Sequence, residues 1–130
     1  MLKVNIFSFS FLYNTIPEDT SGNGGGFIFD CRYIENPGKT EEFRILTGKD
    51  EKVKEFLDKN GVMQNFLKNV FVIINEAIEC YTKRNFTNLM VSFGCTGGQH
   101  RSVYSAEKLN EQIIIKFPHI QTELNHINIS

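Results

Sequence analysis

A long amphipathic segment constrains the fold of this chain more than any other feature of its sequence. Apolar side chains recur at intervals of three and four residues, at Met63, Phe66, Leu67, Val70, Phe71, Ile74, Ala77, Ile78 and Tyr81. This period is that of one face of an α-helix. The segment therefore predicts a helix from about Val62 to Lys83, the strongest such signal in the chain.

Four other segments have the pattern of β-strands. From Val4 to Phe11 the residues alternate, with phenylalanines on one side and serines on the other, which is the period of a strand. The three further strands expected are Phe27–Phe29, Leu89–Phe93 and a weak one near Ile120–Ile127. Between the first two strands, four glycines within Gly22–Gly26 predict an irregular loop, because glycine loses much conformational freedom in regular structure.

Two more helices are expected. One follows Asp50 as N-cap and ends at Asn60-Gly61, and the other runs from about Val103 to Phe117, before Pro118. Strands that alternate with helices predict an α/β fold, here a three-layer-like sandwich whose mixed, partly parallel sheet is flanked by helices. The length of 130 residues fits a single domain, residues 1–130.

Composition excludes several classes of protein. Fifteen acidic against fourteen basic residues leave a formal charge of −1, which argues against a protein whose main task is to grip a nucleic-acid backbone. The longest apolar run, Val70–Ile74, is too short to span a membrane, and the N-terminus has no secretory signal. Three cysteines without close spacing favour reduced thiols and a cytoplasmic location. The histidines lack metal-ligand spacing, so we expect neither a metal site nor a cofactor.

Chemistry concentrates where the strand ending near Phe93 meets the following helix. Gly97 and Gly98 allow close approach of a ligand, and the amides of a helix N-terminus attract anions. The side chains that add hydrogen-bond donors there are Thr96, His100, Arg101 and Ser102. The segment predicts binding of inorganic phosphate, sulfate or a phosphorylated small molecule, with Arg101 holding two of its oxygens. The alternative is a plain tight turn in which Arg101 is solvated.

An enzymatic interpretation of the same segment also has to be considered. Cys95 and Arg101, with five residues between them and Ser102 directly after, resemble the active-site loop of cysteine-dependent phosphatases. In that family a cysteine thiolate attacks phosphorus while the arginine holds the oxygens. Two features depart from the phosphatase pattern. Gly94 stands where a histidine is usual, and no Asp-Pro or Trp-Pro-Asp segment supplies a general acid, so that Asp30 and Asp50 are candidates for that role only by default.

A second resemblance covers more of the chain. The block Gly94–Val103 is similar to the hallmark of the C-terminal domain of the RNase adapter protein (RapZ) family. Further matches to that family follow one another in the same order, at Ser8–Phe11, Ile16-Pro17, Phe29–Tyr33, Asn36-Pro37 and Leu46–Asp50. The resemblance thus extends over roughly residues 4 to 110.

The resemblance implies properties that the spacing of residues alone does not indicate. In that family the C-terminal domain is an α/β unit that senses an amino-sugar phosphate, binds regulatory small RNAs for an endoribonuclease and supports oligomers. The ligand residues it implies here are Cys95, Thr96, Gly97, Gly98, Gln99, His100, Arg101 and Ser102 of the loop, together with Asp30, Arg32 and Asn36. We therefore expect a sensor or adapter that binds a phosphorylated small molecule, rather than an enzyme.

Three departures from the family limit what is carried over. The chain lacks the N-terminal P-loop domain that family members usually carry, so nucleotide hydrolysis is not expected of it. A glycine-rich run follows Pro17 in place of a short acidic stretch. The last residues, 124–130, contain no lysine or arginine, whereas the family's tail is basic. Because each lost phosphate contact weakens nucleic-acid binding, RNA binding is expected to be weak.

Overall fold

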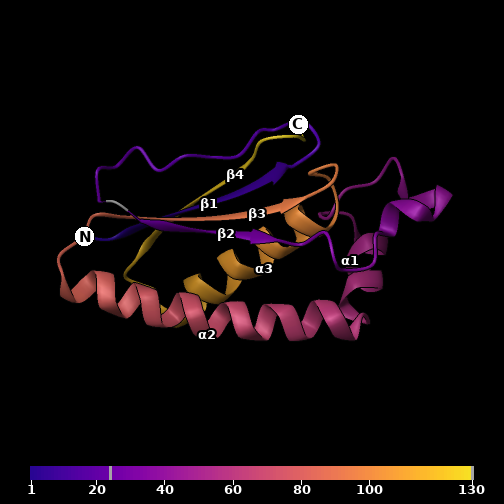
Figure 1. Cartoon of the computed structure of the whole chain (residues 1–130). Helices are drawn as coiled ribbons and strands as arrows, with labels where there is room; N and C mark the ends of the chain where they lie inside the picture. Colours follow the sequence, from indigo (N-terminus) through magenta and orange to yellow (C-terminus); the bar gives the residue numbers. More distant parts are fainter. Residues whose placement is uncertain (24, 130) are drawn as a thin grey trace.

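The structure, a computed structural model, describes residues 1–23 and 25–129 (Figure 1). Gly24 of the glycine-rich run and Ser130 of the C-terminal segment lie outside these described residues. The elements in chain order are β1 (Lys3–Ser10), β2 (Gly26–Asp30), the 3₁₀ turns η1 (Pro37–Lys39) and η2 (Glu41–Phe43), α1 (Glu51–Asp58), α2 (Gly61–Lys83), β3 (Asn88–Cys95), α3 (Arg101–Lys116) and β4 (Gln121–His126). The α/β class predicted from the sequence is confirmed.

The junction between α1 and α2 differs from the prediction. Asn60 was expected to end the first helix together with Gly61, but α1 already ends at Asp58. Asn60 is instead the N-cap of α2, where its side-chain oxygen accepts the N–H of Met63 at 2.9 Å. An Asn-Gly pair can mark either the start or the end of a helix. Here it marks a start, because the first N–H groups of α2 have no partner within the helix and Asn60 accepts one of them.

The four strands form one sheet in the order β2-β3-β1-β4. All three pairings between neighbouring strands are parallel. The sequence predicted a mixed, partly parallel sheet, whereas the described sheet is entirely parallel. The central pair aligns Val4 with Leu89 and Ser10 with Cys95. Because the strands are parallel, their carboxyl ends and the loops that follow them gather at one edge of the sheet.

The connections between strands determine what covers each face of the sheet. The helical connections from β2 to β3 and from β3 to β4 advance across the sheet in one direction, and Figure 1 shows their helices on the same face. The connection from β1 to β2 runs in the opposite direction, so a right-handed crossover places it over the other face. Figure 1 shows residues 11–23 there, so the layer opposite the helices is irregular chain.

The main core lies between the sheet and the helices. It includes Val4 and Ile6 of β1 and Leu89, Val91 and Phe93 of β3, and these side chains pack with the apolar stripes of α2 and α3. The phenylalanines of β1 lie on the opposite face, where Phe9 is fully buried and Phe7 is half-buried. Within the described residues, no helix combines the length and the apolar character needed to cross a membrane.

Gly94 lies under an aromatic pair on that second face. The rings of Phe9 and Phe11 pack edge to face, 4.8 Å between centroids, and a Cβ on Gly94 would collide with both rings. This contact explains why glycine precedes Cys95, since any larger residue would have to displace the buried ring of Phe9 and the half-buried ring of Phe11.

We therefore expect Gly94→Ala to lower the free energy of unfolding by about 1–3 kcal/mol, the usual cost of overpacking a filled site. Urea unfolding measures this change. Gly61→Ala is the matched control, because nothing lies within 4 Å of the new Cβ, and its stability should be unchanged or slightly higher. Equal midpoints for Gly94→Ala and the wild type would show that the rings move aside without cost.

Candidate functional site

The candidate site lies at the carboxyl ends of β1 and β3. These strands are neighbours, yet the chain leaves β1 toward one face of the sheet and leaves β3 toward the other. Open parallel sheets bind ligands at such a switch point, because the diverging connections leave a crevice there. The loop Thr96–His100, between β3 and α3, borders this crevice.

The loop is fixed to β1 through its carbonyl groups and through one glycine. Ser10 Oγ donates to the carbonyl of Thr96 at 2.6 Å, and the N–H of Leu12 donates to the same oxygen at 3.3 Å. Gly98 has φ +65°, and a Cβ on it would lie 2.9 Å from backbone atoms of Phe9 and Ser10. Both its conformation and this close approach therefore require glycine.

Most main-chain donors of the loop lack an oxygen acceptor in the described part of the chain. No described oxygen accepts the N–H groups from Thr96 to Ser102; those of Gln99 and Ser102 are directed at Cys95 Sγ, and those of Arg101 and Ser102 begin the 16-residue helix α3. Amides in this position carry the positive end of the helix dipole. The arrangement can bind an anion.

Cys95 lies beneath this loop and is only 2% exposed. Its Sγ atom is hydrogen bonded to Ser102 Oγ at 3.2 Å. Burial opposes ionisation, but the hydroxyl and amide of Ser102, the charge of Arg101 and the amide of Gln99 outweigh it, so the pKa of Cys95 lies below its usual value. The same groups that stabilise a thiolate here would stabilise another anion.

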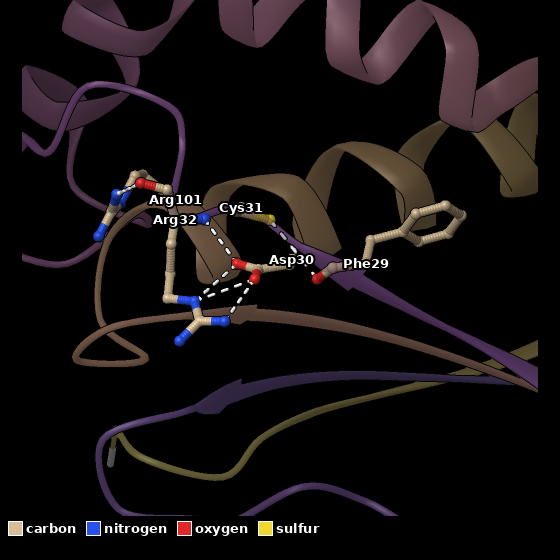
Figure 2. Close-up of polar contacts among 5 residues, drawn as sticks. All are labelled: Phe29, Asp30, Cys31, Arg32 and Arg101. Atoms are coloured by element: carbon tan, nitrogen blue, oxygen red, sulfur yellow. Dashed lines mark hydrogen bonds and ion pairs between the residues drawn. The ribbon is translucent and has the colours of Figure 1, made fainter.

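Arg101 has partners that the sequence did not indicate. Its guanidinium is buried, with 3% of the residue exposed, and Nη1 donates to the carbonyls of Arg32 and Ile34 at 2.9 and 2.8 Å. Figure 2 shows this side chain reaching the Arg32 carbonyl. The Nε atom is buried and has no hydrogen-bond partner among the described residues. Neither bond uses Nε or Nη2, so the expectation that Arg101 holds two ligand oxygens stays a prediction.

Asp30 and Arg32 form an ion pair with each other. The shortest N–O distance is 2.6 Å, both side chains are about half exposed, and Figure 2 shows the pair beside the end of β2. The hydrogen bond from Arg32 lowers the pKa of Asp30. The guanidinium of Arg32 also stacks 4.0 Å from the ring centroid of Phe11. This pair borders the switch point but does not line the hollow beside the loop.

That hollow, of about 230 Å³, is lined by Asn36, Gly38, Arg44, Cys95, Thr96, Gly97, Gln99 and His100. The loop and Asn36 meet here, as the resemblance implied. Asn36 Oδ1 accepts the N–H of Gly38 at 2.9 Å and so shapes this wall. Two residues of this lining, Gly38 and Arg44, were not indicated by the sequence. Arg44 could have been found from its position in the sequence, because it lies two residues before the block Leu46–Asp50 that matches the family.

The side chains of Gln99 and His100 make hydrogen bonds to the main chain that forms one wall of the hollow. Gln99 Nε2 donates to the carbonyls of Arg44 and Leu46, both at 2.6 Å, and His100 Nε2 lies 2.8 Å from the carbonyl oxygen of Phe43. These bonds hold the segment that carries Arg44 against the loop. Burial lowers the pKa of His100, although its hydrogen bond to Phe43 acts in the opposite direction.

Comparison with known proteins gives consistent matches. A family model described as RapZ C-terminal domain matches residues 2–130. Proteins named nucleotide-binding protein are similar: one from Fervidobacterium nodosum is 42% identical over 113 residues, which cover 87% of this chain and 38% of the relative. One from Endomicrobium trichonymphae is 32% identical over 128 residues, which cover 98% of this chain and 42% of the relative. The chain thus spans about two-fifths of the length of these relatives.

The buried neutral ring of His100 predicts a pH dependence of stability. Because folding lowers the pKa of His100, the unfolded chain binds more protons, so stability is fully present above the ordinary value of 6.5 and is lost as the pH falls below it. Between about pH 7.5 and about pH 5, His100→Gln should lose less stability than the wild type, as measured by urea unfolding at each pH. Parallel pH profiles would contradict this role.

Proposed function

The chain belongs to the RapZ C-terminal domain family, and on that basis we propose that the hollow beside the Thr96–His100 loop binds the phosphate group of a phosphorylated small molecule. The observation that carries this proposal is that the main-chain N–H groups of Thr96, Gly97, Gly98, His100 and Arg101 have no oxygen acceptor among the described residues, while those of Gln99 and Ser102 are directed at Cys95 Sγ. A phosphate oxygen supplies what they lack.

Charge and size support the same ligand class. Arg44 is exposed in the wall of the hollow, and in the described part of the chain only its Nε has a hydrogen-bond acceptor, the carbonyl of Gly38 at 3.1 Å. The rest of this guanidinium is free to make charge-assisted bonds to a phosphate. A volume of about 230 Å³ suits a phosphate with part of a small polar body, not a large apolar ligand.

A second hollow, of about 210 Å³, does not suit an anion. It lies under residues 11–23, and its lining includes Glu18 and Asp19 beside the amides of Asn5 and Asn88. Two carboxylates would repel a phosphate, whereas the hollow at the loop presents Arg44 and the helix N-terminus. The phosphate is therefore assigned to the loop.

The finer proposal is that the ligand is an amino-sugar phosphate and that the domain acts as its sensor. The family resemblance supports this identity, and Asp30 offers a carboxylate at the edge of the site for a sugar hydroxyl or ammonium group. To contact a ligand, Asp30 would have to share or release Arg32. RNA binding and self-association stay predictions that depend on the resemblance alone.

Ligand binding is expected to depend on the open space over Gly97. A Cβ at this position meets no atom within 4 Å, so Gly97→Ala should fold normally while its methyl group obstructs the loop amides. Removing Arg44 should act separately, by deleting the exposed cation. We expect each variant to bind glucosamine 6-phosphate and inorganic phosphate at least about tenfold more weakly in calorimetry, the loss expected for a charge-assisted bond.

Matched controls separate these effects from general damage. Gly61→Ala also adds a methyl group in open space, and Arg84→Ala removes an exposed arginine that lies over the Phe86 ring. Both should bind as the wild type does. Glucose 6-phosphate tests the contribution of the amine, and adenosine monophosphate tests a nucleotide as the source of the phosphate. Full affinity in both Gly97→Ala and Arg44→Ala would overturn the assignment of the site.

The cysteine phosphatase remains a second candidate, favoured by the lowered pKa of Cys95 beneath free amides. Against it, Cys95 is almost fully buried, Arg101 holds two main-chain carbonyls, and Gly94 occupies the position of the usual histidine. We expect no hydrolysis of an aryl phosphate such as p-nitrophenyl phosphate. Turnover that disappears in Cys95→Ser would identify a phosphatase, and the sensor proposal would then be wrong.

A further inference from the structure

Two cysteines face each other across adjacent strands at the candidate site. Asp30 of β2 pairs with Gly94 of β3, and the N–H of Cys31 donates to the carbonyl of Gly94 at 2.7 Å. Continuing this register places Cys31 directly opposite Cys95. Neighbouring strands lie about 4.8 Å apart, and a disulfide requires a Cα–Cα distance of about 4.4–6.8 Å, so the backbone spacing suits a bond between them.

Both side chains point to the same face of the sheet. Cys31 Sγ lies 3.9 Å from Ser105 Oγ, and Cys95 Sγ lies 3.2 Å from Ser102 Oγ. The two serines are three residues apart on α3 and are therefore neighbours on its surface. Figure 2 shows the sulfur of Cys31 turned toward α3 and away from the Asp30–Arg32 pair. The two thiols thus lie side by side under the first turns of this helix.

We propose that Cys31 and Cys95 form a reversible disulfide when hydrogen peroxide enters the hollow, and that this bond weakens anion binding by the Thr96–His100 loop. The first part stands on the register and the shared helix contact. The second part rests on the function proposed above for the loop.

The two cysteines have complementary environments. Cys95 lines the hollow, which admits a molecule as small as peroxide, whereas Cys31 is fully buried at 0% exposure. Burial raises the pKa of Cys31, while the groups around Cys95 lower its pKa. Cys95 is therefore the thiolate that reacts first, and Cys31 is the thiol that resolves the product.

The chemistry balances with hydrogen peroxide as the oxidant. The Cys95 thiolate attacks one peroxide oxygen, so an S–O bond forms, the O–O bond breaks and hydroxide leaves to become water. Cys31 then loses its proton and attacks the sulfenic sulfur. The S–S bond forms, the S–O bond breaks, and the departing hydroxide takes the Cys31 proton as a second water. A thiol reductant reverses the bond by exchange.

The loop is mechanically coupled to this bond. A disulfide brings the two Cβ atoms to about 3.8 Å, which is closer than the spacing of neighbouring strands. The ends of β2 and β3 therefore have to approach each other when the bond forms. Cys95 also gives up its hydrogen bond to Ser102 Oγ at the start of α3. Because Thr96 follows directly, the displacement reaches the amides that would hold the anion.

The test uses the full chain with Cys80→Ser, because the exposed Cys80 could otherwise link two molecules. After titration with peroxide and alkylation of free thiols, we expect mass spectrometry to find the Cys31 and Cys95 peptides joined, and dithiothreitol to separate them. Adding Cys31→Ala should abolish the link and leave Cys95 as sulfenic or sulfinic acid. Reduced Cys31→Ala should still bind phosphate, because Cys31 does not line the hollow.

Two results would overturn the proposal independently. Oxidised Cys95 with Cys31 still open to alkylation upon unfolding would exclude the disulfide. A complete disulfide with unchanged affinity would exclude the coupling, since we expect glucosamine 6-phosphate to bind about tenfold more weakly after oxidation. Thermal melting confirms that the oxidised protein is folded. If the reduced protein binds no phosphate, the function proposed for the loop fails, while peptide mapping still decides whether the disulfide forms.

Discussion

The close contact between the β3–α3 loop and the backbone of β1 is the constraint on which the site depends. A Cβ added to Gly98 would lie 2.9 Å from backbone atoms of Phe9 and Ser10, and the residue has a positive φ, so only glycine fits there. Ser10 and Leu12 then occupy the carbonyl of Thr96. These contacts hold the loop against β1, so its main-chain N–H groups lie at the switch point of a parallel sheet.

The polar side chains of the loop build the site more than they fill it. Gln99 and His100 hold the segment from Phe43 to Leu46, and that segment presents Arg44 to the hollow. Arg101 ties the first turn of α3 to the chain after β2. Recognition is thereby left to main-chain amides and to one exposed guanidinium, groups that suit the oxygens of a phosphate without selecting the molecule attached to it.

The sequence predicted the elements with strong periodicity and indicated the β3–α3 loop as the candidate site, but it did not indicate the hydrogen-bond partners of the loop's side chains. The stripe of α2 and the alternation of β1 depend on local spacing, and both elements formed as expected. Whether a donor such as Gln99 faces a ligand or a carbonyl depends on Arg44 and Leu46, more than fifty residues away in the chain. Which segment of the chain covers the face of the sheet that carries Phe9 likewise depends on the order of the strands, and no local sequence pattern encodes that order.

The buried charge of Arg101 gives the site its electrostatic character without touching the hollow. A buried guanidinium whose Nε is unpaired is costly, because its lost hydration is only partly replaced by two carbonyl contacts. That charge contributes to the lowered pKa of both Asp30 and Cys95, which lie on the two strands at either side of it. Removing such a charge from water strengthens its field over short distances. The stabilisation of anions at the end of β2 and β3 therefore comes from a cation held behind the loop as well as from the amides in front.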